Sequence, residues 1–360
     1  MASIFIGFYG YPVNVKQKDL IHVISKGFEC WDLSKVSFDD FVKKIKKRIP
    51  PINDNVLRNY IASLDTDWGI NEEQFKKCSW GLLLPDKTDQ GNSYTQILGV
   101  LNLYSTAFLR PAFYVTNFAI FPVNKKANGT WLHTQDKSHI FKSQNFISFY
   151  KKALPMGEYF QWYRENVLLW KEEDWRFYFS ASFYDGLKEY EIGKSIYTWQ
   201  AESADISTLF ETLLTAGDSK NEEIGYRLRK RLFVLIGWKF PSIEENVKTL
   251  YTDRSDFVHG NLYKKIIKSM KKNESNDPAM PVSPAFKQLY ESKEQARFSL
   301  IAYWYLHFIK DNKKNKTFKK YKNVQEVLES GILDTKLREK IVAAVKPIIE
   351  LLPQSATGNF

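Results

Sequence analysis

The residues best suited to chemistry lie in one short segment, which reads Tyr-Thr-Asp-Arg-Ser-Asp-Phe-Val-His-Gly over residues 251–260. It contains Arg254 and His259, separated by four residues and followed by a glycine. A histidine titrates near neutral pH, so it can act as a general acid or base. An arginine stays charged and offers a planar fork of donors that matches phosphate oxygens. Together the two are suited to proton transfer beside a developing negative charge.

The spacing alone is a weak signal, because an arginine and a histidine this far apart occur by chance in many proteins. On an ideal helix, residues five positions apart are about 140° apart around the axis. The two side chains would share a cleft only if Arg254 sits in the first turn of its helix, or if a second chain completes the site. The structural alternative pairs Arg254 with Asp253, Asp256 or Glu211 and makes His259 a helix C-terminal residue favoured by the macrodipole.

The surrounding sequence resembles HEPN domains, whose motif is R-x4-6-H, and in particular the subgroup called Apea-like HEPN. Residues 209–214 resemble the first core helix of that subgroup, with the acidic Glu211 in an apolar setting. Residues 223–231 and 235–237 resemble its next helix, and Leu250-Tyr251 precede the motif in the same order. The resemblance covers about residues 174–355. The first half of the chain resembles no family that we recognise.

The resemblance implies a metal-independent endoribonuclease that acts as a dimer with two facing motifs and needs no cofactor. It assigns proton transfer to His259 and stabilisation of transition-state charge to Arg254. The 2′-hydroxyl of the RNA would attack, leaving a cyclic phosphate and a free 5′-hydroxyl. Ser255, Asp256 and Glu211 are candidates for a supporting role. Many HEPN motifs have Asn or Asp after the arginine, and the serine at 255 is compatible with the Apea-like subgroup.

Basic residues suggest a polyanionic partner. The formal net charge is +11, with 52 Lys and Arg against 41 Asp and Glu. A lysine cluster follows the motif and alternates with apolar residues as an amphipathic helix would; its candidates for contacts to RNA phosphates are Lys264, Lys265 and Lys268. The alternative for this cluster is a solvated helix face.

Several classes of site are not expected. The two cysteines, Cys30 and Cys78, make neither a disulfide framework nor a zinc site, which favours a reducing cytoplasm. The histidines lack metal-ligand spacing, and the pair His133 and His139 is interpreted as a loop feature. There is no P-loop, dinucleotide fingerprint or nucleophile elbow. The apolar run at 299–309 is too short to span a bilayer, so we expect a cytoplasmic protein without a membrane partner.

The elements that must position the motif divide the chain in two, and the expected fold class is α+β. Residues 1–172 are predicted to form an α+β domain of unknown specificity, with strands at 4–9, 80–84 and 113–123. A helix is predicted to begin at the N-cap Ser37 and to stop before Pro50. Residues 173–355 are predicted to form an all-α, HEPN-like bundle. Its predicted helices lie at 173–193, 203–215, 222–237, 243–259 and from 284 to 309, with further helices ending near 352.

The sequence therefore predicts a HEPN-type ribonuclease in phage defence or a stress response, cutting RNA such as tRNA. A trigger or inhibitor would act through the N-terminal domain. The alternative is a bundle that binds RNA or a partner protein without catalysis. A third hypothesis is that the bundle binds nucleotides. Fold analogy alone does not decide between these functions.

Overall fold

The computed structural model describes two compact units, residues 1–158 and 159–360. Each is described here by itself, and the division falls inside helix α5. Within them the described residues are 2–9, 21–25, 27–49, 75–76, 78–86, 93–105, 111–115, 120–122, 144–165, 175–176, 179–180, 184, 196–216, 223–258, 267, 284–312 and 316–353.

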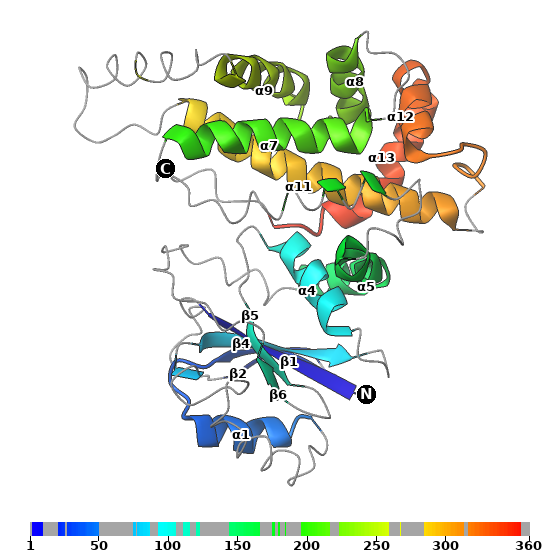
Figure 1. Cartoon of the computed structure of the whole chain (residues 1–360). Helices are drawn as coiled ribbons and strands as arrows, with labels where there is room; N and C mark the ends of the chain where they lie inside the picture. The colour runs from blue at the N-terminus through cyan, green and yellow to red at the C-terminus, as the bar shows by residue number, and fades with distance from the viewer. Residues whose placement is uncertain are drawn as a thin grey trace. The chain divides into compact units, whose positions relative to one another are not determined.

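The first unit is built on a six-stranded sheet in which every neighbouring pair is antiparallel (Figure 1). The strand order is β2-β3-β4-β1-β5-β6, so the first strand lies inside the sheet. The strands are β1 (Ala2–Tyr9), β2 (Ile21–Ser25), β3 (Phe28–Asp32), β4 (Cys78–Asp86), β5 (Pro111–Val115) and β6 (Ile120–Pro122).

Helices cover both faces of this sheet, with α1 on one side and α4 and α5 on the other (Figure 1). Side chains alternate between the faces of a strand, and Phe5 and Trp31 point to the face where Phe41 of α1 packs. On the opposite face, Phe28 makes edge contacts with Phe146 and Tyr150 of α5. The helices are α1 (Phe38–Lys46), α4 (Ser93–Tyr104) and α5 (Gln144–Glu165).

The predicted first helix and two of the predicted strands are confirmed. Ser37 is the N-cap of α1, and its hydroxyl accepts a hydrogen bond of 3.1 Å from the Asp40 amide. The single strand predicted at 113–123 is wrong, because β5 and β6 are two strands that pair antiparallel there. The sequence also left β2, β3, α4 and α5 unpredicted.

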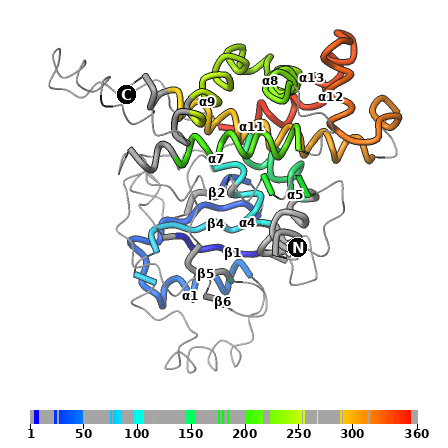
Figure 2. Tube along the Cα trace, turned by 45° about the horizontal axis from the view of Figure 1, so that its top comes forward, coloured from blue at the N-terminus to red at the C-terminus, as the bar shows by residue number. Residues whose placement is uncertain are grey.

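The second unit contains six long helices among its described residues (Figures 1 and 2). The longest, α11, packs against the other five and runs beside α7 in both views. The helices are α7 (Ile196–Leu214), α8 (Ile224–Ile236), α9 (Ile243–Val258), α11 (Pro284–Asp311), α12 (Val324–Leu333) and α13 (Thr335–Ile349).

An α+β fold is thus what the structure shows, a sheet-based unit followed by a helical unit. The helices predicted at 203–215, 222–237 and 243–259 correspond to α7, α8 and α9, although α7 begins earlier, at Ile196. The predicted division after residue 172, and most of the helix predicted at 173–193, lie outside the described residues. Across the described part of the chain, no helix is both long and apolar enough to cross a membrane.

A buried ion pair joins α7 to α11 in the core of the second unit. Glu202 Oε2 lies 2.8 Å from Lys293 Nζ. Burial raises the pKa of Glu202 and lowers the pKa of Lys293, because a low-dielectric surrounding disfavours both charged forms, while their mutual attraction opposes both shifts. The pair therefore links α7 to α11 at a buried position, where an unpaired charge on either residue would destabilise the fold.

We expect Gly81→Ala to destabilise the first unit by about 1–3 kcal/mol, because core overpacking costs this much. A Cβ at Gly81 would lie 2.2 Å from the ring of Phe5, at the centre of the sheet. Chemical denaturation, with hydrogen exchange of β1 and β4 as the local readout, measures the loss. The matched control is Gly225→Ala in α8, where a Cβ meets nothing within 4 Å. This control should be neutral or stabilising by up to about 1 kcal/mol, and equal losses at both positions would contradict the packing described here.

Candidate functional site

The end of helix α7 is held by side chains from three other parts of the second unit. Gln325 Nε2 donates to the carbonyl of Leu213 at 3.2 Å, and Arg176 Nε donates to the carbonyl of Ala216 at 2.9 Å. Between them, Arg231 Nη1 donates to the carbonyl of Leu214. The last carbonyls of a helix have no partners within it, so these donors satisfy groups that would otherwise be buried without hydrogen bonds.

The donors are themselves fixed. Arg231 is buried, and its Nε and Nη2 both lie 2.8 Å from Glu329 Oε2 of α12. Gln325 Nε2 also donates to the Tyr303 hydroxyl of α11 at 2.8 Å. Helices α8, α11 and α12 therefore together locate the last turn of α7, which is the turn that carries Glu211. A side chain on such a segment has little freedom to drift.

Helix α9 brings the motif arginine to the same place. The helix begins with Glu244 and Glu245, whose charges favour an N-terminus. Its buried stripe consists of Ile243, Val247 and Leu250. The spacing of this stripe continues into Arg254, so the arginine extends the face that packs on the bundle.

One carboxylate oxygen joins the two helices. Glu211 Oε1 lies 2.7 Å from Arg254 Nη1 and accepts a second hydrogen bond, of 2.6 Å, from the hydroxyl of Tyr251. The side chain of Glu211 is 27% exposed and that of Arg254 is 35% exposed, so the cluster lies at the edge of the bundle. Among the described residues, Nη2 and Nε of Arg254 have no hydrogen-bond partner. These two nitrogens can still donate to an anion.

Tyr251 acts as a hydrogen-bond donor throughout the ordinary pH range. Its pKa is raised, first by burial and then by the hydrogen bond to Glu211 and the negative charge of that carboxylate, while the charge of Arg254 acts in the opposite direction. A neutral phenol between two charged side chains keeps its proton directed at Glu211.

The structure thus brings two of the predicted site residues, Arg254 and Glu211, into contact. Ser255 follows Arg254 in α9 and is exposed, and Asp256 lies in the same helix. The other predicted site residues lie outside the described residues; they are His259 and the lysines Lys264, Lys265 and Lys268.

Of the three acids considered as partners of Arg254, Glu211 binds it. The side chains of Asp253 and Asp256 lie outside what the structure describes. Tyr251 was not among the predicted site residues. The helical spacing could have indicated this residue, because a side chain three positions before Arg254 lies on the same face of the helix.

Other chemistry has little support in the described part of the chain. No group of three or more His, Cys, Asp or Glu side chains with the geometry of a metal site occurs among the described residues. Both cysteines are buried. Burial raises the pKa of the Cys78 thiol to about 12, so it stays protonated at neutral pH and is a poor nucleophile.

Comparison with known proteins finds no similarity that identifies the chain. No protein-family model matches it, and neither the search of curated proteins nor the search of solved structures returns a match. The function is therefore inferred from the site itself.

We expect Tyr251→Phe to destabilise the second unit by about 1–2 kcal/mol, the worth of a hydrogen bond to a partly exposed carboxylate. Because the folded pKa of Tyr251 is raised, its stabilising contribution is complete below the unfolded value of about 10. It is lost as pH rises above that value towards the folded pKa. Unfolding free energies of parent and variant, compared between pH 7 and 11, measure this.

The matched control is Tyr226→Phe, since Tyr226 is exposed and its hydroxyl has no hydrogen-bond partner among the described residues. Two results would contradict the hydrogen-bonded cluster. One is a loss of unfolding free energy in Tyr251→Phe that is no larger than in Tyr226→Phe. The other is a difference in unfolding free energy between parent and Tyr251→Phe that grows above pH 10.

Proposed function

We propose that this chain is a metal-independent endoribonuclease of the HEPN type, with Arg254 and His259 as its catalytic residues. The observation that supports this most is the cluster of Glu211, Tyr251 and Arg254 at the edge of the helical bundle. It holds a permanently charged fork by one nitrogen, and among the described residues the other two nitrogens have no partner and can bind a phosphate. The histidine needed for proton transfer comes five positions later in the sequence.

The reaction needs only these groups and the RNA. The 2′-oxygen of the substrate forms a bond to the adjacent phosphorus, and the bond from phosphorus to the 5′-oxygen breaks. His259 accepts the proton of the 2′-hydroxyl as general base, and the imidazolium formed in this way gives a proton to the leaving 5′-oxygen. Arg254 stabilises the charge that builds up on the phosphate oxygens. The products are a 2′,3′-cyclic phosphate and a 5′-hydroxyl.

The position of Arg254 favours a site made by two chains. It is the twelfth of the 16 residues of α9, so the first-turn placement that would let both side chains of one helix share a cleft does not apply. His259 follows the described end of α9 at Val258, and on a helix continued by one residue it would be about 140° from Arg254 around the axis. We therefore propose a homodimer in which Arg254 of one protomer acts with His259 of its partner, across an isologous contact.

The remaining parts of the proposal concern substrate and control. Lys264, Lys265 and Lys268 would contact RNA phosphates beside the site and position the strand without reading its sequence. Ser255 and Asp256 would support the site from the same helix as Arg254. The sheet-based first unit would carry the trigger or inhibitor contact, in a defence or stress response that targets RNA such as tRNA.

One observation favours a second candidate function, a non-catalytic module for RNA or protein binding. A carboxylate that accepts hydrogen bonds from an arginine and a tyrosine also forms a structural link between two helices. Here the link joins α7 to α9. In that case Arg254 would stabilise the bundle and the lysines would account for any affinity for RNA.

Purified protein incubated with total RNA and tRNA in EDTA should cut RNA to fragments with cyclic phosphate ends. Arg254→Ala and His259→Ala should each lower the cleavage rate by at least about 100-fold, the usual contribution of a general acid–base or of a transition-state donor. Lys248→Ala is the matched control, because Lys248 is an exposed cation on the same helix. Its rate should stay within about twofold of the parent rate.

Circular dichroism and thermal melting establish that each variant is folded. Cleavage that survives both Arg254→Ala and His259→Ala in folded protein would refute the proposed site. RNA binding that weakens steeply with salt, without cleavage products, would favour the binding module.

A further inference from the structure

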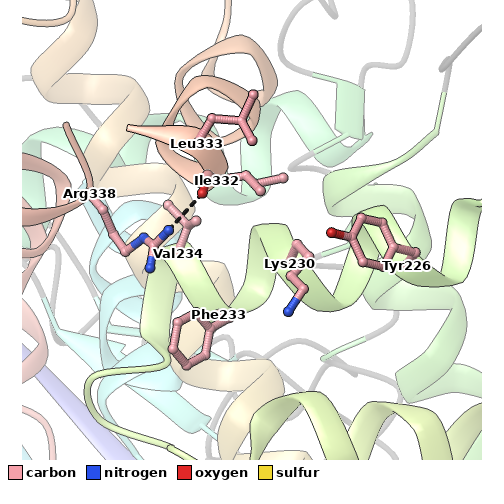
Figure 3. Close-up of a pocket in the computed structure, with 7 residues that line it drawn as sticks. All are labelled: Tyr226, Lys230, Phe233, Val234, Ile332, Leu333 and Arg338. Carbon is pink, nitrogen blue, oxygen red and sulfur yellow. Dashed lines mark hydrogen bonds between the residues drawn. The ribbon is translucent and has the colours of Figure 1, made fainter. Parts of the chain in front are cut away.

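A pocket of about 270 Å³ opens on the second unit, and none of the residues of the proposed catalytic cluster lines it. Figure 3 shows its lining side chains, which come from α8 and from the corner between α12 and α13. They are Tyr226, Lys230, Phe233, Val234, Ile332, Leu333 and Arg338.

The corner between α12 and α13 is sharp, because Asp334 alone separates the two helices and caps the second one. Its carboxylate accepts a hydrogen bond of 3.0 Å from the Leu337 amide. Arg338 closes the end of α12 by donating to the carbonyls of Gly331 at 3.1 Å and Ile332 at 2.7 Å. This geometry leaves the side chain of Leu333 91% exposed at the rim of the pocket. The backbone at this position does not require an apolar residue.

The pocket has an apolar floor and a cationic edge. The floor consists of Phe233 and the buried Val234, and the Arg338 guanidinium lies 5.7 Å from the centre of the Phe233 ring. Lys230 Nζ is already bound by both oxygens of Glu244, at 2.8 and 3.1 Å. Arg338 uses Nε and Nη2 on carbonyls, and its Nη1 has no hydrogen-bond partner among the described residues. Among the described contacts, Arg338 Nη1 is thus a donor that can bind a ligand beside the apolar floor of the pocket.

The size of the pocket limits what can occupy it. Sites for drug-sized ligands and cofactors measure about 300–1,000 Å³ and enclose most of the ligand. This pocket lies at the lower end of that range, and its volume accommodates one large apolar side chain. The exposed Leu333 and the half-exposed Tyr226 would add apolar contact around such an anchor. Tyrosine and arginine beside an apolar pocket are typical of the centre of a protein–protein contact.

The charge around the pocket identifies the kind of partner. The three helices that line the pocket carry eight basic residues and three acids: four basic residues on α8, four basic residues and Glu339 on α13, and Glu326 and Glu329 on α12. A second copy of this chain would bring the same positive helices together, which costs free energy. RNA would need several cations without partners at the pocket, and there Lys230 and two nitrogens of Arg338 are already engaged. An acidic protein segment satisfies both the charge and the apolar floor.

We propose that this pocket is a docking site for an acidic segment of another protein, which inserts one large aliphatic or aromatic side chain between Leu333 and Tyr226. The inserted side chain packs on Phe233 and Val234. A carboxylate next to it in the segment accepts a hydrogen bond from Arg338 Nη1. The lining residues differ from those of the catalytic cluster, so the docking proposal is tested independently of the ribonuclease proposal.

The test uses the full chain against a displayed library of random dodecapeptides, followed by fluorescence anisotropy with synthetic copies of the enriched peptides. We expect the enriched peptides to share one Leu, Ile, Phe or Trp flanked by Asp or Glu. Replacing that anchor by Ala should weaken binding at least about tenfold, as for an interface hot spot. Leu333→Ser and Tyr226→Ser should each weaken it at least about fivefold.

Both variants replace exposed side chains, so the fold is expected to survive, and thermal melting checks it. The matched control is Val23→Thr, an exposed apolar residue of the first unit, which should bind as the parent does. Four outcomes would overturn the proposal: basic or anchor-free enriched peptides, equal binding by Leu333→Ser and parent, displacement of the peptide by single-stranded RNA, or loss of a self-associated form in Leu333→Ser.

Discussion

The candidate site depends on one carboxylate oxygen. Glu211 Oε1 receives a charged hydrogen bond from Arg254 and a neutral one from Tyr251, both short, and it does so across the contact between α7 and α9. Every other feature of the site is arranged around this junction. The stripe of α9 directs Tyr251 and Arg254 towards it, and the side chains that cap α7 hold Glu211 in place.

The ion pair between Glu211 and Arg254 contributes more to the geometry of the site than to the stability of the fold. Ion pairs with about a third of each side chain exposed are worth roughly 0–1 kcal/mol, because water already solvates both partners. The restraint on the guanidinium is the larger effect, since an arginine held at one nitrogen presents its remaining donors in a fixed direction. By contrast, Arg231 and the pair Glu202–Lys293 are largely buried, and they satisfy backbone carbonyls or each other. These charges help to fix the positions of the helices, and Arg231 does so at the turn of α7 that carries Glu211.

Several elements could be predicted from the sequence because their causes are local. The N-cap Ser37 and the apolar spacing of α8 and α9 depend on neighbours within a few residues. The partner of Arg254 could not be chosen in this way, since Glu211 lies 43 residues earlier and competes with two nearer acids. The strands β2 and β3 are short and lack clean alternation, and they become stable only by pairing with each other and with β4. Likewise the segment 113–123 has the composition of one strand, and its division into β5 and β6 follows from their antiparallel pairing.

The pocket beside α12 and α13 was equally inaccessible to sequence reasoning. Leu333 ends an apolar helix and is followed by a helix-capping aspartate, so the local pattern predicts a buried side chain. The one-residue corner turns it outward instead. Exposure of this kind is a property of the angle between two helices, and that angle is set by the packing of both on α8.

The measurement that tests the central claim most directly is complementation between two inactive variants. Arg254→Ala and His259→Ala proteins are unfolded together, refolded as a mixture, and assayed with tRNA in EDTA. If each site takes its arginine from one chain and its histidine from the other, half of the dimers are mixed and contain one intact site. The mixture should then recover roughly a quarter of the parent rate. A mixture in which mixed dimers form but which remains as inactive as its components would contradict a site shared by two chains.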